Sequence, residues 1–451
     1  MNIIVVGCGK IGRATISSLV SEGHDVTAID NDESVLTEIS NIYDVMSICA
    51  NGAECESLKE ANVSDCDLFI AVTGSDESNM LSCFMAKKLG AKHTFARVRN
   101  PEYNTSLSFM RQHLELDASI NPELMVAREI YNILKFPSAI KVETFSSRNL
   151  EMVDVKLKAN SALDGIVLSE LREKYNSQVL VCAVQRADEV IIPDGNFVLK
   201  SGDKITITAS PADINKFLRK AGILQKRVND VMIVGGSKTA YYLSKMLLNL
   251  GISVKIIDKD KARCEVLSEI LPNAVIINGN GTEQELLLEE GLDTTDAFVS
   301  LTGIDEENIL ISIFASSLDV AKIVTKVNKK EMANMAEKLN LDCVVSPRTI
   351  TSDVLVRYAR ALQNSMGSNV ETLYKILDGK AEALEFNVNA DSSFTNVAFK
   401  DLKTKSNILI AGIVRGRKLI IPSGDDIIQK GDKVIVIATN QILNDLSDIL
   451  A

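Results

Sequence analysis

The sequence contains two copies of one pattern, and this internal duplication limits the possible folds more than any other feature. The segment NIIVVGCGKIGRA (Asn2 to Ala14) aligns with DVMIVGGSKTAYY (Asp230 to Tyr242). Further along, DLFIAVTGSDESNML (Asp67 to Leu81) aligns with DAFVSLTGIDEENIL (Asp296 to Leu310) at nearly the same separation. Residues 1–223 and 229–451 are therefore expected to be two repeats of one structural unit, called here the first and the second repeat.

Each repeat begins with short apolar strands that alternate with helical segments, such as the strand Ile3 to Val6 followed by a helix from Ile11 to Glu22. This βαβ pattern predicts a doubly wound parallel sheet of the Rossmann type. The end of each repeat has several alternating strands and turn glycines, which predict a small α+β domain. The predicted fold class is thus α/β, with two Rossmann-like domains that are each followed by a small α+β domain. The expected domains are 1–120, 137–221, 229–346 and 369–451.

A helical stretch is expected between the two parts of each repeat, at Pro122 to Phe136 and Pro347 to Gln363. The second stretch carries an apolar stripe at helical spacing, formed by Ile350, Val354, Leu355, Tyr358 and Leu362. Such a stripe is compatible with packing inside the chain and with subunit assembly. The sequence leaves both open.

The run Gly7, Cys8, Gly9, Lys10, Ile11, Gly12 is a G-x-G-x-x-G motif that follows a strand and opens a helix. In this motif the first glycine allows a tight turn, the second lets a pyrophosphate approach the backbone, and the third lets the helix pack closely on the strand. The helix amino terminus then offers amide donors to phosphate groups. The motif predicts a dinucleotide site in the first repeat.

Asp30 stands at the end of the second strand, eighteen residues after Gly12. A carboxylate there can accept hydrogen bonds from a ribose diol and repels a 2′-phosphate, which favours NAD or an adenosine nucleotide over NADP. The alternative is a surface aspartate that caps the next turn. Asn51-Gly52 and Thr73-Gly74 follow the third and fourth strands, at the sheet edge where open α/β folds bind ligands, and are expected to line the adenosine pocket.

Four further polar residues near this edge have two interpretations each. Ser75 and Asp76 precede a helix and would cap it or favour its positive end, and this structural role is favoured over ligand binding. Arg97 and Arg99 follow the fifth strand and could pair with phosphates, although Arg99 fits a solvated or ion-paired role equally well.

The second repeat keeps the acidic residue as Asp258, but its loop differs at two positions. It reads Gly235, Gly236, Ser237, Lys238, Thr239, Ala240. Serine at the second glycine position places a Cβ where a phosphate would approach, whereas alanine at the third is a tolerated packing change. Lys238 could still reach a phosphate. Nucleotide occupancy of this second site is left open.

Composition excludes several other classes of function. A net charge of −11 argues against general binding of nucleic acid or anionic lipid. Charged residues interrupt every apolar run, so direct membrane insertion is not expected. The eight cysteines form no CxxC pair, and the three histidines do not recur between the repeats, so neither a metal site nor a catalytic residue is predicted. Binding without turnover is the simpler interpretation.

The run GCGKIG with Asp30, the phrases AVTGSDESNM and ARVRNPEY, and the pair IIPDG/IIPSG together resemble the regulator-of-K⁺-conductance (RCK) family. The resemblance implies that each repeat is an RCK amino-terminal nucleotide-binding domain with a small RCK carboxyl-terminal domain. It further implies NAD(H) as ligand, with ATP or ADP as additional ligands. The residues so implied are the Gly7 to Gly12 loop, Asp30, Asn51, Gly52, Thr73, Gly74 and Arg97 in the first site, and Gly235 to Thr239 with Asp258 in the second.

The resemblance also implies a role: a cytoplasmic, non-enzymatic gating subunit of a Trk-type potassium uptake system. Its partner would be an integral membrane K⁺-translocating subunit of TrkH or TrkG type, beneath which the chain would form a homo-oligomer, expected to be a tetrameric ring. Two alternatives from other classes remain. They are an NAD-dependent oxidoreductase and a stand-alone soluble nucleotide sensor. The small domains fit dimerisation by sheet packing better than an effector site.

Overall fold

The computed structural model describes residues 1–105, 107–145, 150–159, 161–187, 189–364, 370–390, 392–439, 441, 443 and 445–450. The predicted start of the second small domain at 369 and its end at 451 lie outside these ranges. Contacts divide the chain into two compact units, and each unit contains a segment of both repeats. Met1–Ile130 and Asp230–Ala359 form the first unit, and Tyr131–Asn229 and Arg360–Ala451 form the second.

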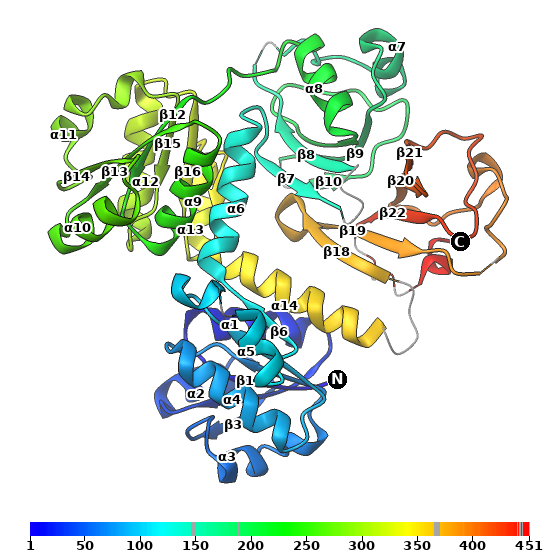
Figure 1. Ribbon diagram of the computed structural model, residues 1–451. Coiled ribbons are helices and arrows are strands. Elements are labelled where there is room, and N and C mark those ends of the chain that lie inside the picture. Colours follow the sequence, from blue (N-terminus) through cyan, green and yellow to red (C-terminus); the bar gives the residue numbers. More distant parts are fainter. Residues whose placement is uncertain are drawn as a thin grey trace. The chain divides into compact units, whose positions relative to one another are not determined.

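The first unit contains two six-stranded sheets of the same topology, one from each repeat (Figure 1). In the first repeat the strand order is β3-β2-β1-β4-β5-β6, and every neighbouring pair is parallel. The elements are β1 (Asn2–Val6), α1 (Lys10–Ser21), β2 (Asp25–Asp30), α2 (Glu33–Ser40), β3 (Met46–Cys49), α3 (Cys55–Glu60), η1 (Val63–Asp65), β4 (Leu68–Ala71), α4 (Asp76–Lys88), β5 (His93–Arg97), η2 (Pro101–Thr105), α5 (Leu107–His113) and β6 (Ala118–Ile120).

The second repeat reproduces this order as β14-β13-β12-β15-β16-β17. Its elements are β12 (Asp230–Val234), α9 (Lys238–Asn249), β13 (Ser253–Asp258), α10 (Lys261–Ile270), β14 (Val275–Asn278), α11 (Gln284–Glu289), η4 (Leu292–Thr294), β15 (Ala297–Ser300), α12 (Asp305–Ser317), β16 (Lys322–Lys326), α13 (Lys330–Lys338) and β17 (Val344–Val345). The register is conserved between the copies, since Val6 faces Ile29 in the first sheet and Val234 faces Ile257 in the second.

The central strands form the core of each parallel sheet. In β4 all four residues, Leu68–Ala71, are buried, because both faces of a doubly wound sheet are covered. Phe69, from this strand, lies in a cluster with residues of α3, α4 and β5. The chain reverses its direction of winding between β1 and β4, and this switch point opens a crevice at the carboxyl ends of the strands.

Two long helices follow the parallel sheets, α6 (Pro122–Lys135) and α14 (Pro347–Asn364). On α14, Leu355 of the predicted stripe is fully buried, and the ring of Tyr358 meets the ring of Phe95 on β5 edge-on at 5.2 Å. Val356 and Ala359 are buried as well, although neither belongs to the predicted stripe. The middle of the stripe therefore packs within the chain.

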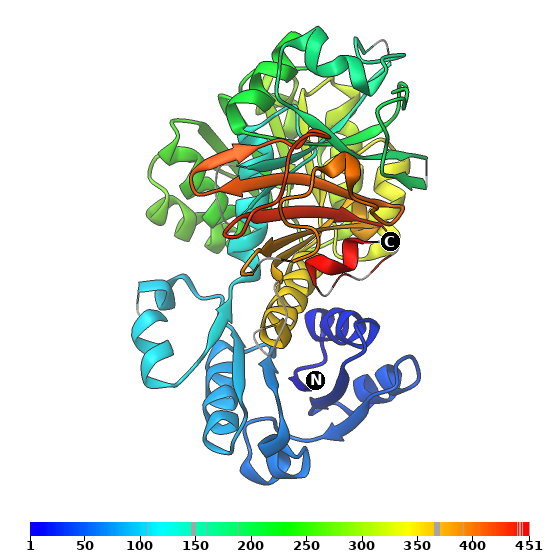
Figure 2. The same cartoon turned by 90° about the vertical axis from the view of Figure 1, so that its right-hand side faces the viewer.

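The second unit contains two five-stranded sheets, which again share one topology: β10-β9-β11-β8-β7 and β18-β19-β22-β20-β21. The strands of the second sheet, orange to red in Figure 2, lie side by side and pair antiparallel. The elements are β7 (Lys141–Thr144), β8 (Glu151–Lys156), η3 (Leu168–Glu170), α7 (Leu171–Tyr175), β9 (Leu180–Arg186), β10 (Glu189–Ile191), β11 (Lys204–Ala209), α8 (Pro211–Lys220), β18 (Val370–Ile376), η5 (Leu377–Gly379), β19 (Ala381–Asn387), η6 (Phe399–Asp401), β20 (Ile408–Arg415), β21 (Lys418–Ile420), β22 (Lys433–Ala438) and η7 (Leu446–Ile449).

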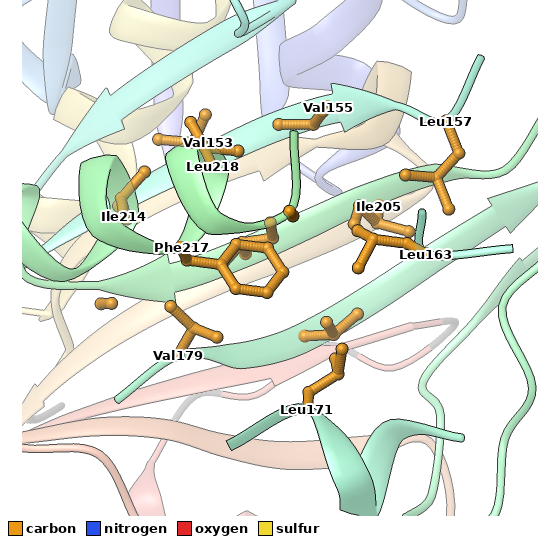
Figure 3. Packing of buried hydrophobic residues seen from close by; sticks show 14 of the residues in the cluster. Val153, Val155, Leu157, Leu163, Leu171, Val179, Ile205, Ile214, Phe217 and Leu218 are labelled. Carbon is orange, nitrogen blue, oxygen red and sulfur yellow. The ribbon is translucent and has the colours of Figure 1, made fainter. Parts of the chain in front are cut away.

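Each small domain has its own core. In the first, Phe217 of α8 packs among Val153 of β8, Ile205 of β11 and Val179, which directly precedes β9 (Figure 3). A separate apolar cluster contains residues of both small domains, including Phe145 and Met152 of the first and Tyr374 of the second. The two small domains therefore share a core within one chain. The four sheets together confirm the predicted fold class.

Candidate functional site

The loop between β1 and α1 is shaped by glycines with different surroundings. Gly7 has φ +91°, and a Cβ there would lie 2.7 Å from the amide nitrogen of Thr73. A Cβ on Gly12 would lie 1.9 Å from the carbonyl oxygen of Gly7. Gly9, in contrast, faces open space, with nothing of the described chain within 4 Å of the position its Cβ would take. Gly7 and Gly12 thus allow backbone segments to pass close to one another, whereas Gly9 leaves room for a ligand.

The amino terminus of α1 has the features of an anion site. Its N-cap residue is Gly9, and no side chain of the described residues caps it. The first-turn amides therefore retain donors for an incoming phosphate, and the helix dipole favours negative charge there. In the second repeat the corresponding Ser237 places its hydroxyl 3.4 Å from the amide of Ala240 and accepts its hydrogen bond. Helix α9 is thus capped by the side chain of Ser237, which occupies the place of Gly9.

Asp30 lies at the end of β2 and lines the same crevice as the loop between β1 and α1. One oxygen of its carboxylate accepts from the amide of Cys8, and the other accepts from the amide of Asp32 at 3.0 Å. A carboxylate has about four acceptor positions, so lone pairs remain for a ribose diol. The Cys8 side chain turns away into the core, and burial, helped by the nearby charge of Asp30, raises the pKa of its thiol to about 12.

The loops after β3 and β4 form the opposite wall. Asn51 accepts from the amide of Ala53 at 3.1 Å, and the approach of Gly52 to Val6 leaves no space for a Cβ, which would lie 2.2 Å from the valine Cγ1. The amide of Thr73 donates to the side chain of Asn79 at 2.8 Å. These contacts fix the two loops independently of any ligand.

Sequence reasoning missed Asn79, which holds the β4 loop in place. This fully buried side chain accepts from Thr73 and donates to the carbonyl of Arg97 at 2.9 Å, so it ties the end of β4 to the end of β5. The equivalent Asn308 bonds the amide of Thr302 and the carbonyl of Lys326 in the same way. The signal was present in the aligned phrases TGSDESN and TGIDEEN, in which this asparagine recurs.

Ser75 and Asp76 have separate roles. Ser75 is the N-cap of α4 and accepts from the amide of Ser78 at 3.1 Å, as the capping interpretation predicts. Asp76 is not the N-cap but the first residue of α4, and as an acidic side chain in the first turn it favours the positive end of the helix, as predicted. Its buried carboxylate accepts from the amides of Arg99 and Asn100, both at 2.8 Å, and thereby holds the segment after β5.

Arg97 and Arg99 also differ in their burial and in their partners. Arg97 is 9% exposed, its Nη2 donates to the carbonyl of Thr73, and its Nε has no partner among the described residues. Desolvation, with a smaller effect of Arg99, lowers the pKa of its guanidinium. Arg99 donates to the carbonyl of Gly74 and pairs with Asp76 at 3.4 Å, so its ion-paired role is the one observed.

These elements enclose a cavity of about 810 Å³ at the switch point of the first sheet. Of the predicted first-site residues, it is lined by Gly7, Gly9, Lys10, Ile11, Asp30, Asn51, Gly52, Thr73, Gly74 and Arg97. Cys8 and Gly12 do not line it, because one side chain is in the core and the other position packs against the loop. The second repeat also contributes to this wall, with Ser237, Lys238, Thr239, Lys326, Asn328, Pro347 and Arg348.

A second cavity of about 430 Å³ lies at the switch point of the second sheet. Gly235, Gly236, Ser237 and Asp258 line it, whereas Lys238 and Thr239 face the first cavity instead. Asp258 accepts from the amide of Gly236, as Asp30 does from Cys8. Arg263 of α10 also lines this cavity and donates to the carbonyl of Gly236.

Within the described ranges, no group of three or more His, Cys, Asp and Glu side chains is arranged to hold a metal ion. All eight cysteines lie in those ranges and are free thiols. The same part of the chain has no helix that combines the length and the apolarity needed to cross a bilayer.

The family models that match are the TrkA-N domain, at residues 3–122 and 231–347, and the TrkA-C domain, at 152–222 and 383–451. The chain is 33% identical over 440 residues to the Trk system potassium uptake protein TrkA homolog of Archaeoglobus fulgidus, with 97% of each chain covered. It is 30% identical to the Trk system potassium uptake protein TrkA of Haemophilus influenzae, with 97% of this chain and 95% of that one covered. The chain belongs to the TrkA family of Trk system potassium uptake proteins.

Solved structures agree with this assignment at the level of the fold. The GsuK channel superposes with a TM-score of 0.65 at 16% identity, covering 97% of this chain and 77% of that one. The GsuK RCK domain and the GsuK channel bound to NAD each give 0.63 at 15% identity over 97% of this chain, and over 92% and 77% of theirs. The two repeats therefore have the RCK fold.

Proposed function

We propose that this chain is the nucleotide-binding regulatory subunit of a Trk-type potassium uptake system. It binds NAD(H), and ATP or ADP, in the first repeat, and it controls K⁺ flux through an integral membrane subunit of TrkH or TrkG type. It acts as a homo-oligomeric ring, a tetramer, held at the cytoplasmic face of the membrane by that partner. Family membership supports the transport role, and the NAD-bound GsuK channel supports the cofactor.

The observation that carries the nucleotide assignment is the first cavity, which combines an uncapped helix amino terminus with an acidic residue at the end of β2. The amides of α1 suit a pyrophosphate, and Asp30 suits the ribose of an adenosine that has no 2′-phosphate. The Cβ-free position Gly9 lies where the phosphates would approach. On this proposal the site binds the nucleotide without turnover.

Regulation then follows from linkage. A nucleotide can shift the ring between two conformations only by the difference between its affinities for them, and such coupling is typically about 1–3 kcal/mol. The membrane subunit would respond to that change of conformation. A reaction of the nucleotide is not needed.

The test compares Asp30→Ala with Asp258→Ala. The two aspartates make the same local bonds, to the amides of Cys8 and Gly236, so the second variant controls for damage to the loop. Calorimetric titration with NAD⁺, NADH, ATP and ADP should show weaker binding in Asp30→Ala by roughly tenfold or more, the value of a hydrogen bond to a charged group. K⁺ uptake by cells carrying that variant should lose its nucleotide response.

Unchanged nucleotide affinity and unchanged K⁺ flux in Asp30→Ala would refute the proposal. Steady oxidation of NADH by the isolated chain with a small-molecule substrate would instead favour an oxidoreductase. Normal nucleotide binding by a chain that has no effect on K⁺ uptake and does not co-purify with membranes at low salt would favour a stand-alone sensor.

A further inference from the structure

Two helices connect the parallel domains to the small domains, and each of them passes from the first compact unit into the second. Helix α6 belongs to the first unit up to Ile130, and helix α14 up to Ala359. Their last residues, Tyr131–Lys135 and Arg360–Asn364, belong to the second unit. The way in which these ends are fixed therefore decides whether a movement of a parallel domain is passed on to the small domain that follows it.

The end of α14 is fixed by an ion pair. Arg360 donates from Nη1 and Nη2 to the two carboxylate oxygens of Glu382 on β19, at 3.1 and 3.2 Å. The two side chains are 12% and 18% exposed, so the pair is largely shielded from water. An arginine that is joined to a carboxylate by two parallel bonds forms one of the stronger and more directional polar contacts in proteins. This pair joins the helix to the small domain of the second repeat.

Lys135 and Glu151 are the equivalent residues of the first repeat. Lys135 stands as far along α6 as Arg360 stands along α14, counted from the proline that opens each helix. Glu151 and Glu382 occupy the same place in their sheets, because each faces the alanine that ends the neighbouring strand, β11 or β22. The two repeats can therefore be compared position by position at this contact.

Lys135 and Glu151 both lie in the described ranges, and they form no ion pair there. The ammonium of Lys135 lies 5.4 Å from the centre of the Phe136 ring, and Oε2 of the buried Glu151 has no partner among the described residues. Burial raises the pKa of the Glu151 carboxyl, against an opposing effect of Lys135. The chain at the end of α6 is anchored by apolar contacts, since Phe136, directly after the helix, packs on the core of the first small domain.

Glu382 also borders a polar cavity. The cavity has a volume of about 590 Å³, lies in the second unit and is lined as well by Glu189, Lys380 and Asn407. A carboxylate that loses its arginine at this place can be hydrated, so opening of the pair does not leave a buried charge without a partner. Separation of the apolar contacts after α6 would instead expose apolar surface to water. The ion pair is thus the contact that can open and close.

We infer that Arg360 and Glu382 form a latch between α14 and the second small domain, an ion pair that opens and closes while the folds on either side stay intact. The equivalent described residues of the first repeat form no latch, so α6 stays anchored to its small domain. A change in the second parallel domain reaches the second small domain when the latch is closed, and is absorbed at the end of α14 when it is open. This inference goes beyond the proposed function and does not depend on the nucleotide assignment.

The test is hydrogen exchange of the full chain, followed by mass spectrometry, with Arg360→Gln as the main variant. Exchange in the last turn of α14 should become faster by roughly tenfold or more, as expected for lost bonds to a charged group, while β19 and β22 stay protected. Lys135→Gln, at the equivalent position of the first repeat, is the matched control and should leave the end of α6 unchanged. Arg360→Lys keeps the charge but loses the paired geometry, so its exchange should lie between those of the wild type and Arg360→Gln.

Charge reversal separates the latch from a general loss of stability. Arg360→Glu should make exchange at the end of α14 fast, and the additional change Glu382→Arg should slow it again. Unchanged exchange at α14 in Arg360→Gln, equal loosening of α6 by Lys135→Gln, or a double variant that exchanges as fast as Arg360→Glu alone would overturn the latch. Loss of protection across β19 and β22 in Arg360→Gln would overturn it too, because the pair would then be part of the small-domain fold.

Discussion

Gly9 and Gly12 lie three residues apart in the same loop, yet a methyl group added to each would meet different surroundings. At Gly12 it would meet the carbonyl oxygen of Gly7 at 1.9 Å, which is a backbone atom that cannot move aside. At Gly9 it would point into the open cavity, and the backbone φ of −66° suits alanine. The same substitution therefore separates the glycine that the backbone packing needs from the one that, in the proposed function, leaves room for the phosphates.

We expect Gly12→Ala to lower the free energy of unfolding by about 1–3 kcal/mol, the usual cost of overpacking. Gly9→Ala should leave that free energy nearly unchanged and reduce nucleotide affinity, because its methyl group would occupy the path of the phosphates. Urea unfolding and calorimetric titration of both variants would check this. A loss of stability in Gly9→Ala as large as in Gly12→Ala would contradict it.

The loop itself could be predicted from the sequence because a glycine spacing that follows a strand and precedes a helix is a local pattern. The bonds of Asp76 to the segment after β5, and the choice between the roles left open for Arg99, could not be predicted. Asp76 bonds residues that lie 23 and 24 positions further along the chain, and local spacing contains no information on such a contact. The capping prediction held for Ser75, whose partner is three residues away.

At the scale of elements, α4 and α12 are docked by equivalent aspartates. Asp76 accepts from two amides after β5, and Asp305 accepts from the amides of Asn328 and Lys329 after β16, both at 2.9 Å. In each repeat this bond sets the position of the strand end that carries the cavity cation, Arg97 or Lys326. The helix thereby helps to position the cavity wall, to which α4 itself contributes Ser78 and Ser82.

Asp76→Ala should therefore destabilise the fold more than Ser75→Ala. Loss of the buried carboxylate leaves two amides without their charged acceptor, at a cost of about 1.5–3 kcal/mol for each such bond. Loss of the cap costs about 1 kcal/mol. Urea unfolding of the two variants gives the comparison. Equal destabilisation would show that Asp76 stabilises only the amino terminus of α4 and does not hold the segment after β5.

Element boundaries followed from the sequence to within a few residues. The first helix was expected from Ile11 to Glu22 and spans Lys10–Ser21, and the long helices α6 and α14 begin at the predicted prolines. These ends are marked by local signals, a glycine loop or a proline in the first turn. The extra contribution of Lys238 and Arg348 to the first cavity had no such signal, because it depends on how the repeats meet.

At the scale of the whole molecule, each compact unit combines like domains of the two repeats. Both parallel sheets belong to one unit and both antiparallel sheets to the other. The duplication predicted two copies of each domain, but the pairing of like with like depends on contacts between residues more than a hundred positions apart, such as Asn121 with Tyr242 at 3.1 Å. The sequence alone does not contain that pairing.

The two small domains share an apolar core. This core predicts that a mutation in one repeat can destabilise the small domain of the other repeat, whereas a mutation in a domain's own core destabilises only that domain. The ring of Phe145 meets Tyr374 of the other repeat edge-on at 4.8 Å, whereas Phe217 meets Tyr175 of its own domain at 5.4 Å. Either phenylalanine replaced by alanine should cost about 3–5 kcal/mol, because both side chains are fully buried. Their effects on hydrogen exchange should differ.

In Phe145→Ala the amides of β18 and β19 in the second repeat should lose protection together with those of β8, because one apolar cluster contains side chains from these strands. In Phe217→Ala the loss should be confined to the first small domain, whose own core holds that ring. Hydrogen exchange followed by mass spectrometry resolves the two patterns. If Phe145→Ala left β18 and β19 fully protected, the small domains would be stable independently, and a conformational change in one repeat could not reach the other through this core.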